Sequence, residues 1–433
     1  MITRVRLAAL CAVLVLGTGA VRGAPATPLE QAFDAYWKAD SPKAAAAAAS
    51  QVLATGAGFD EILSRLRRGR TYGTAQTGVV LLRYPAIDGT FENRITVPAD
   101  YTPDARLPLR VQLHGGINRP EPGQGGPGRA RAQGAVGNRI EGERQIYVEP
   151  SGWADAPWWS ATQVDNILRV VDTVKRRYNV DETQLYLTGI SDGGTGAYYI
   201  GTREATLWAT IMPLNGSIMV LRNPAVGVWG EVFPENLTNT PFYVVNGGRD
   251  PLYPVRDVAK PIDWLQAMGV SLIFRPQPEA GHDTSWWPAE RAPYEAFVHE
   301  HRREAHPVRL SLQTERTDRF NRIKWLVIDK LGASASDATF PEVGAFAHGR
   351  GAGRVDIERR GNAFTASTRG VRTFRLLLSP DAIDFSQPTT VVVNGRQRFA
   401  GTVRPDPHVL LTWNERDNDR TMLYGAELTI AVE

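Results

Sequence analysis

Cysteine is almost missing from this chain: Cys11 is the only one among 433 residues. Without a second thiol the chain can form no internal disulfide, so its fold is expected to rest on an apolar core alone. An excess of charge of one sign is missing as well, because 49 basic residues face 46 acidic ones. This balance gives no reason to expect a nucleic acid or an anionic surface as a partner.

The N-terminus also lacks an apolar run long enough to span a membrane as an anchor. Residues Leu7 to Leu16 are apolar, which is far short of the roughly 20 residues that cross a bilayer. Arg4 and Arg6 precede this run and small residues follow it, as in a cleaved secretory signal. We therefore expect residues 1–23 to be removed at Val21-Arg22-Gly23, giving a periplasmic or secreted protein. Cleavage would remove Cys11 and three arginines, so the mature chain would have no cysteine and no net formal charge.

The rest of the chain divides into three regions by its hydrophobic patterning. Residues 24–77 have helical periodicity, and residues 78–307 alternate short apolar strands with amphipathic helices. Such alternation predicts a mostly parallel sheet flanked by helices. A stretch rich in glycine, proline and arginine, 119–137, interrupts this order and is expected to be a long loop.

Residues 308–433 have strand patterning and predict an accessory β-sandwich. Asn394-Gly395 stands between two strand-like runs, and this dipeptide favours a hairpin turn with positive φ at both positions. The strands that we expect here are 324–329, 354–358, 373–378, 389–393, 396–400, 409–413 and 428–432.

A candidate nucleophile lies in the middle region, at Ser191. The segment Gly189-Ile190-Ser191-Asp192-Gly193 matches G-x-S-x-G, follows the expected strand 184–188 and precedes an expected helix. This is the context in which a sharp strand-to-helix turn exposes a nucleophilic serine, with glycines on either side to prevent clashes. The alternative is a glycine-rich structural turn.

An oxyanion hole for this serine needs two backbone N–H donors. We assign one to Asp192, which follows the nucleophile, and the other to Gly116 or alternatively Ile117, in the loop that begins Leu113-His114-Gly115-Gly116. His114 is expected to order this loop through a hydrogen bond, since the catalytic base of this architecture follows the serine in the chain.

Elimination gives the base and the acid. Among the histidines after Ser191, only His282 lies in a loop between a strand and a helix, where the chain order Ser, acid, His requires it. Of the aspartates between them, Asp250 follows a strand through a flexible turn and is the preferred acid. Asp257 and Asp263 resemble early helix residues, which the helix dipole favours there.

Tryptophans gather near these residues in the sequence. Trp286 and Trp287 follow His282, and Trp153, Trp158 and Trp159 precede the nucleophile. We expect Trp286, Trp287 and Trp159 to contact substrate, although packing inside the core explains such residues equally well.

The segment from Tyr178 to Gly194, with Leu113-His114-Gly115-Gly116, Gly248-Arg249-Asp250 and Gly281-His282 in the same order, resembles the secreted polyhydroxybutyrate depolymerase and feruloyl esterase-like hydrolases. The likeness covers about residues 78–305. It implies an α/β-hydrolase fold, to which the C-terminal β-sandwich is added, and ester substrates. Asp192 is a departure, because these relatives often have a small residue there.

The sequence therefore predicts an exported serine hydrolase that cleaves a carboxylic ester of a small molecule or polymer, with the triad Ser191, Asp250 and His282. We expect no cofactor, no metal, no nucleic acid and no membrane anchor, and the oligomeric state stays open. Two alternatives remain at this point: a prolyl-oligopeptidase-like peptidase with the same triad order, and a catalytically silent binding protein built on a hydrolase scaffold.

Overall fold

The computed structural model describes residues 26–86, 89–117, 142–332, 346 and 351–432. The expected signal, 1–23, and the expected long loop, 119–137, lie outside the described residues. The N-terminal helices α1 (Pro28–Lys38) and α2 (Pro42–Ala54) pack against each other and form a compact unit by themselves. Thr27 and Ser41 cap them, each accepting a hydrogen bond from a backbone N–H of the first turn. The second unit begins at Gly58 with α3 (Phe59–Arg68) and contains everything described below.

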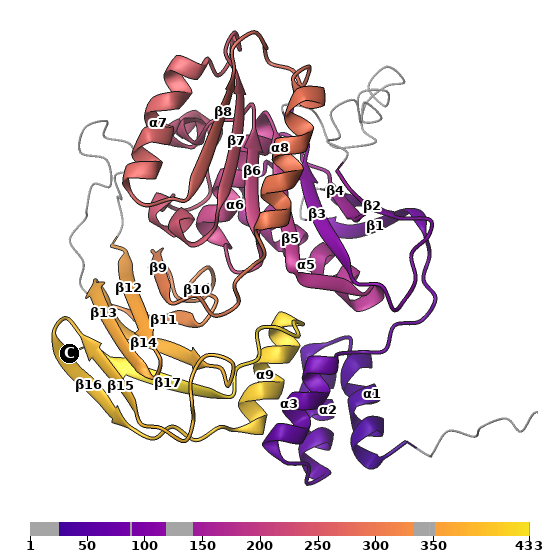
Figure 1. Ribbon diagram of the computed structural model, residues 1–433, viewed down its shortest axis with the longest axis vertical. Coiled ribbons are helices and arrows are strands. Elements are labelled where there is room, and N and C mark those ends of the chain that lie inside the picture. Colours follow the sequence, from indigo (N-terminus) through magenta and orange to yellow (C-terminus); the bar gives the residue numbers. More distant parts are fainter. Residues whose placement is uncertain (1–25, 87–88, 118–141, 333–345, 347–350, 433) are drawn as a thin grey trace, which may run out of the picture. The chain divides into compact units, whose positions relative to one another are not determined.

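The second unit contains an eight-stranded sheet (Figure 1). Its strands are β1 (Gly78–Ala86), β2 (Gly89–Val97), β3 (Leu107–Leu113), β4 (Ile146–Pro150), β5 (Val180–Ile190), β6 (Thr210–Leu214), β7 (Phe242–Gly247) and β8 (Leu272–Gln277). They follow one another in the order β1-β2-β4-β3-β5-β6-β7-β8. The pairs that contain β2 are antiparallel and all the others are parallel. This is the mostly parallel sheet of an α/β-hydrolase fold, as the sequence predicted.

Helices cover both faces of this sheet. Alternate residues of β7 show the division: Phe242 and Val244 belong to one apolar cluster, and Tyr243 and Val245 to another. The first cluster includes buried side chains of α5 (Ala161–Arg177), α6 (Asp192–Arg203) and α7 (Val255–Ala267). The second includes those of α8 (Trp287–Glu300). Because side chains alternate across a strand, a strand covered on both faces is apolar throughout.

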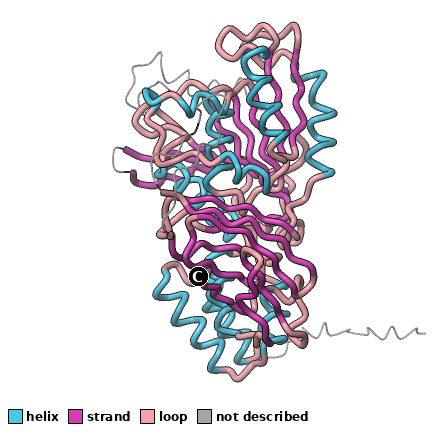
Figure 2. Tube along the Cα trace, turned by 90° about the vertical axis from the view of Figure 1, so that its left-hand side faces the viewer, coloured by secondary structure: helices cyan, strands magenta, loops and turns pink. Residues whose placement is uncertain are grey.

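The C-terminal residues form two sheets around their own apolar core, as expected for a β-sandwich. One sheet has the order β10-β11-β14-β17 and the other β16-β15-β13-β12-β9. The strands are β9 (Arg309–Thr314), β10 (Arg322–Ile323), β11 (Leu326–Leu331), β12 (Gly353–Arg360), β13 (Ala363–Arg369), β14 (Val371–Leu378), β15 (Thr389–Val393), β16 (Arg396–Gly401) and β17 (Ala426–Ala431). They lie side by side in the middle of Figure 2. Asn394 and Gly395 form the β15–β16 hairpin with φ of 50° and 76°, which confirms the predicted turn.

One expected strand is wrong, because residues 409–413 lie in a helix, α9 (Pro407–Asp417). Asp406 caps this helix by accepting a hydrogen bond from the His408 N–H (2.8 Å), and Asn418 ends it in a left-handed conformation. A short apolar run does not distinguish a strand from a buried helix. The cap residues on either side of the run were the better signal.

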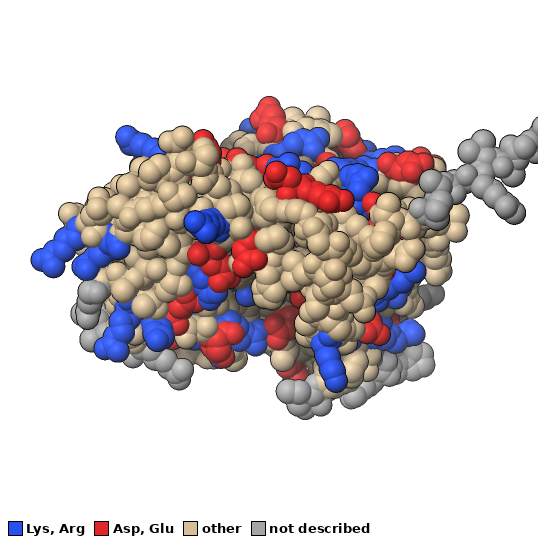
Figure 3. Space-filling model, turned by 90° about the horizontal axis from the view of Figure 1, so that it is seen from below, with Lys and Arg blue, Asp and Glu red and all other residues tan. Residues whose placement is uncertain are grey.

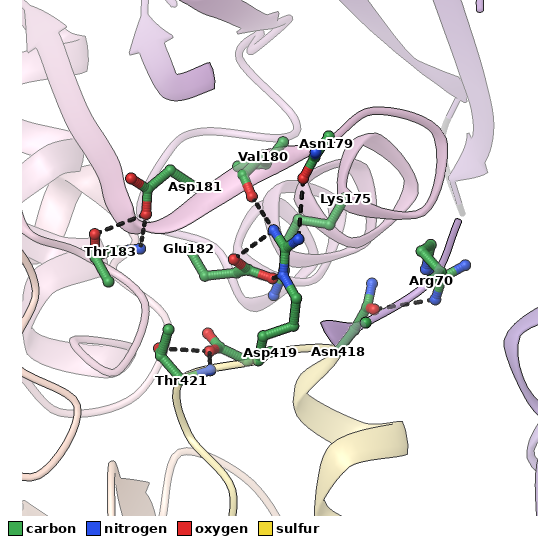
Figure 4. Close-up of polar contacts among 12 residues, drawn as sticks. Arg70, Lys175, Asn179, Val180, Asp181, Glu182, Thr183, Asn418, Asp419 and Thr421 are labelled. Atoms are coloured by element: carbon green, nitrogen blue, oxygen red, sulfur yellow. Dashed lines mark hydrogen bonds and ion pairs between the residues drawn. The ribbon is translucent and has the colours of Figure 1, made fainter. Parts of the chain in front are cut away.

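A polar contact joins the sandwich to β5, the strand that leads to Ser191. Figure 4 shows Asn179, Val180 and Glu182 beside the segment that follows α9, in which Asn418, Asp419 and Thr421 are labelled. Arg420 donates to both Glu182 carboxylate oxygens, at 2.6 and 2.8 Å, and to Asn179 Oδ1 at 3.0 Å. Both members of the ion pair are buried. The accessory sheets are thus connected to the hydrolase sheet by desolvated charges.

Charged side chains elsewhere are mixed. The face of the protein in Figure 3 has acidic and basic residues interspersed. None of the helices in the described ranges is both long enough and apolar enough to cross a membrane.

Candidate active site

Ser191 lies at the tight turn between β5 and α6. Its φ of 58° and ψ of −120° fall in a region that non-glycine residues rarely adopt. The turn brings backbone atoms so close that a Cβ on Gly189 would lie 2.1 Å from the Gly193 oxygen. The strained turn thus requires glycine beside the serine, and it presents Ser191 at the N-terminus of α6.

The structure brings three of the predicted side chains together. His282 Nε2 lies 2.8 Å from Ser191 Oγ, and His282 Nδ1 lies 2.7 Å from Asp250 Oδ2. With Nδ1–H donated to the carboxylate, Nε2 is free to accept the serine proton. This is a hydrogen-bonded chain of serine, histidine and aspartate.

The Asp250 carboxylate is held in place by burial and by backbone hydrogen bonds. It is 1% exposed, and its second oxygen, Oδ1, accepts hydrogen bonds from the backbone N–H groups of Leu252 (2.8 Å) and Tyr253 (2.9 Å). The two competing aspartates lie in α7: Asp257 is in its first turn, as expected, but Asp263 lies in its second half, which corrects the expectation of an early position.

The loop after β3 lies directly against the nucleophile. A Cβ on Gly115 would be 2.9 Å from Ser191 Cβ, so only glycine permits this approach. His114 orders the loop as expected: Nδ1 is 2.8 Å from the Gly115 oxygen, and Nε2 accepts the Gly152 N–H at 3.0 Å. The buried Trp158 donates from Nε1 to the His114 oxygen at 2.9 Å.

Of the proposed oxyanion donors, Asp192 is the first residue of α6, and the first N–H groups of a helix have no intrahelical acceptor. Gly116 lies in the loop with a φ of 66°. Ile117 is different, because its N–H donates to the Asp192 side chain, Oδ2, at 3.0 Å. The alternative donor is thereby engaged, and Gly116 is left as the proposed second donor.

Two residues beside His282 were missed in the sequence. Asn215 follows β6 with a φ of 46°, and its side chain donates to the Asp283 oxygen at 2.6 Å, which fixes the histidine loop. The dipeptide Asn215-Gly216 after an apolar strand is a turn signal that indicated a special conformation there. The ring of Tyr253 contacts that of His282 edge-on at 5.6 Å between centroids. Burial raises the pKa of Tyr253 to about 12, and the Asp192 and Asp250 carboxylates act in the same direction.

The three tryptophans expected to contact substrate are packed against the core. Trp159 is 5% exposed, and its Nε1 donates to the Val226 oxygen at 2.7 Å. Trp286 is also 5% exposed, and the partly buried Trp287 packs edge-on against it and against Tyr294. Packing is the role that these contacts show, and contact with substrate stays a prediction.

In the described part of the chain, no group of three or more histidine, cysteine or acidic side chains is arranged to hold a metal ion. The residues gathered at Ser191 form a hydrogen-bonded serine centre instead.

Comparisons with known proteins give structural neighbours only. No family model and no curated protein matches the sequence. A thermostable esterase is 20% identical with a TM-score of 0.39 over 52% of this chain and 63% of its own. A ferulic acid esterase is 18% identical with a TM-score of 0.39 over 52% of this chain and 100% of its own. An acylaminoacyl peptidase from Pyrococcus horikoshii is 14% identical with a TM-score of 0.38 over 54% of this chain and 42% of its own.

Proposed function

We propose that this protein is a serine hydrolase that cleaves carboxylic esters through an acyl-enzyme. The observation that carries the proposal is the chain of hydrogen bonds from Ser191 Oγ through His282 to Asp250. Ser191 lies at a strained turn and at the N-terminus of α6, an arrangement that stabilises negative charge. A structural role explains neither the strain nor the buried carboxylate behind the histidine.

The geometry supports the following reaction. Ser191 Oγ attacks the carbonyl carbon of the ester while its proton moves to His282 Nε2. Asp250, held by two backbone N–H groups, stabilises the imidazolium and keeps its orientation. The C–O bond to the alcohol then breaks, and His282 returns the proton to the departing oxygen.

Water clears the acyl group in a second cycle of the same kind. His282 Nε2 takes a proton from the water as its oxygen attacks the acyl carbon, and then gives a proton back to Ser191 Oγ. In both cycles the N–H groups of Asp192 and Gly116 would bind the oxyanion. A single such donor is typically worth on the order of 100-fold in rate.

Labelling of Ser191 with a fluorophosphonate probe tests the chemistry. We expect one adduct, mapped to Ser191 by mass spectrometry, and no adduct in the Ser191→Ala variant. The same variant should lose turnover of nitrophenyl acyl esters. An unlabelled wild-type protein would indicate a binding protein on a hydrolase scaffold and would end the proposal.

Assays with matched ester and amide substrates test the ester preference. A nitrophenolate is expelled more readily than a nitroaniline nitrogen, so we expect nitrophenyl esters to react faster than nitroanilides of the same acyl group. Rates on peptide amides that equal those on esters would assign the centre to a peptidase instead.

Export is proposed on the signal-like sequence of residues 1–23. Expression of the full chain in a Gram-negative host should give a periplasmic protein whose N-terminus begins at residue 24. An uncleaved chain retained in the cytoplasm would refute this part of the proposal.

A further inference from the structure

The Asp192 side chain joins the two parts of the proposed oxyanion hole. Its backbone begins α6, directly after Ser191, and its Oδ2 accepts the Ile117 N–H at 3.0 Å. Ile117 follows Gly116 in the loop after β3. One carboxylate therefore links the helix that carries the nucleophile to the loop that carries the other donor.

The first part of the loop is held at two residues, one on either side of Gly116. At its beginning, His114 is fixed by its ring contacts and by Trp158. Directly after Gly116, Ile117 is held by Asp192. Gly116, with a φ of 66°, has no side chain to orient it. The direction of its N–H therefore depends on the two held residues that flank it.

The link to Asp192 is a part-buried hydrogen bond to a carboxylate. A carboxylate makes a shorter and stronger hydrogen bond with an N–H group than a neutral acceptor does. Ile117 is 2% exposed, so losing the acceptor would leave its N–H unpaired and buried. The loop would then shift to find another partner. A negative side chain at the start of α6 also suits the positive end of the helix dipole.

We infer that Asp192 is a positioning residue, whose carboxylate aims the Gly116 N–H at the oxyanion formed on Ser191. This inference rests on the proposed function. The role that we assign to the carboxylate acts through the Ile117 N–H and not through contact with the reacting atoms.

Replacement of Asp192 by alanine and by asparagine tests the inference. The alanine variant keeps the Asp192 backbone N–H and removes the acceptor for the Ile117 N–H. We expect kcat on a nitrophenyl ester to fall about 10- to 100-fold, which is no more than the typical fall when one oxyanion donor is removed. KM should change less than about threefold, because the effect belongs to the transition state. The asparagine variant keeps an acceptor oxygen and should recover most of the loss.

A transition-state readout separates positioning from a merely structural role. An arylboronic acid adds to Ser191 Oγ and places a boron-bound oxygen in the oxyanion hole, so its Kd should rise in Asp192→Ala by about the same factor as kcat/KM falls. Fluorophosphonate titration gives the fraction of competent sites, and rates are expressed per labelled site.

An alanine variant with wild-type kcat per labelled site, or with unchanged boronate affinity, would overturn the inference. So would an asparagine variant as slow as the alanine one. These results are distinct from failure of the proposed function, in which the wild-type protein itself is neither labelled nor active.

Discussion

Replacing Arg420 with methionine should destabilise the whole second unit through Glu182. The two side chains form an ion pair with exposed fractions of 7% and 4%, and Arg420 also donates to Asn179 and to the Val180 oxygen. Without the guanidinium, the Glu182 carboxylate is buried with no countercharge. Breaking such a pair from one side costs about 3–5 kcal/mol. This is a large fraction of the roughly 5–15 kcal/mol that stabilises a typical domain.

A second replacement shows whether the unpaired charge is the cause. In Arg420→Met combined with Glu182→Leu, neither charge of this pair is left without its partner, and the free energy of unfolding should return to within about 2 kcal/mol of the wild type. The remaining loss comes from Asn179 and Val180, whose oxygens no longer have this donor. Arg420→Lys keeps the charge without the forked geometry, and its free energy of unfolding should lie between those of the single and the double variant.

Urea denaturation followed by tryptophan fluorescence measures these differences, provided that the slope with denaturant stays constant. Arg83→Met is the matched control, because Arg83 pairs with Glu92 at the surface, with exposed fractions of 61% and 39%. This variant should change the free energy of unfolding by less than about 1 kcal/mol. A loss below about 1 kcal/mol in Arg420→Met, or a double variant as unstable as the single one, would refute the reasoning.

Three further predictions concern the centre and its surroundings. Asp250→Asn should keep an acceptor for the two backbone N–H groups but disfavour the reactive histidine tautomer, which lowers kcat about 10⁴-fold at neutral pH. The control variant Asp257→Asn should have little effect on kcat. Equal losses of kcat in the two variants, measured with a nitrophenyl ester, would contradict the assignment of Asp250. Gly189→Ala should abolish labelling by the fluorophosphonate, because its Cβ would lie 2.1 Å from the Gly193 oxygen; a fully labelled variant would show that the turn tolerates a side chain. Burial lowers the pKa of His306 to about 4 in the folded state, with an opposing contribution from Asp381. The unfolded chain therefore binds this proton first, near pH 6.5. Stability should be fully present above that pH and fall by about 3 kcal/mol as the pH decreases to 4. The urea midpoints of the wild type and His306→Gln at pH 7 and 4.5 measure this, and parallel losses would exclude the histidine as the source.

The regular elements of the hydrolase sheet were predictable because their signals are local. A strand covered on both faces is a short apolar run, as in residues 242–245, and the covering helices have apolar residues at helical spacing. The secondary structure of the sandwich was harder to predict. Strands β9 and β13 were not predicted, and α9 was predicted as a strand, since a few apolar residues fit either structure.

Single side chains differ in how far along the chain their contacts reach, and those with local contacts are easier to predict. His114 was expected to order its loop, and its two ring contacts do so. Trp159 and Trp286 were expected at the substrate, with core packing as the equal alternative; both are buried, and contact with substrate stays a prediction. Nearness in sequence does not tell which side of the sheet a large ring will occupy, because that choice depends on the helices that cover it.

The sequence by itself determined the elbow at Ser191, the glycine loop after β3 and the chain order of the candidate acid and base. These features depend on backbone geometry over a few residues, which glycines and apolar runs specify directly. Only the tertiary structure decided which aspartate meets His282, that the Asp192 carboxylate binds the Ile117 N–H, and that Arg420 of the sandwich neutralises Glu182 on β5. Each of these contacts joins residues far apart in the chain. Packing of the sheets brings them together, and burial then makes an unpaired charge or N–H group costly.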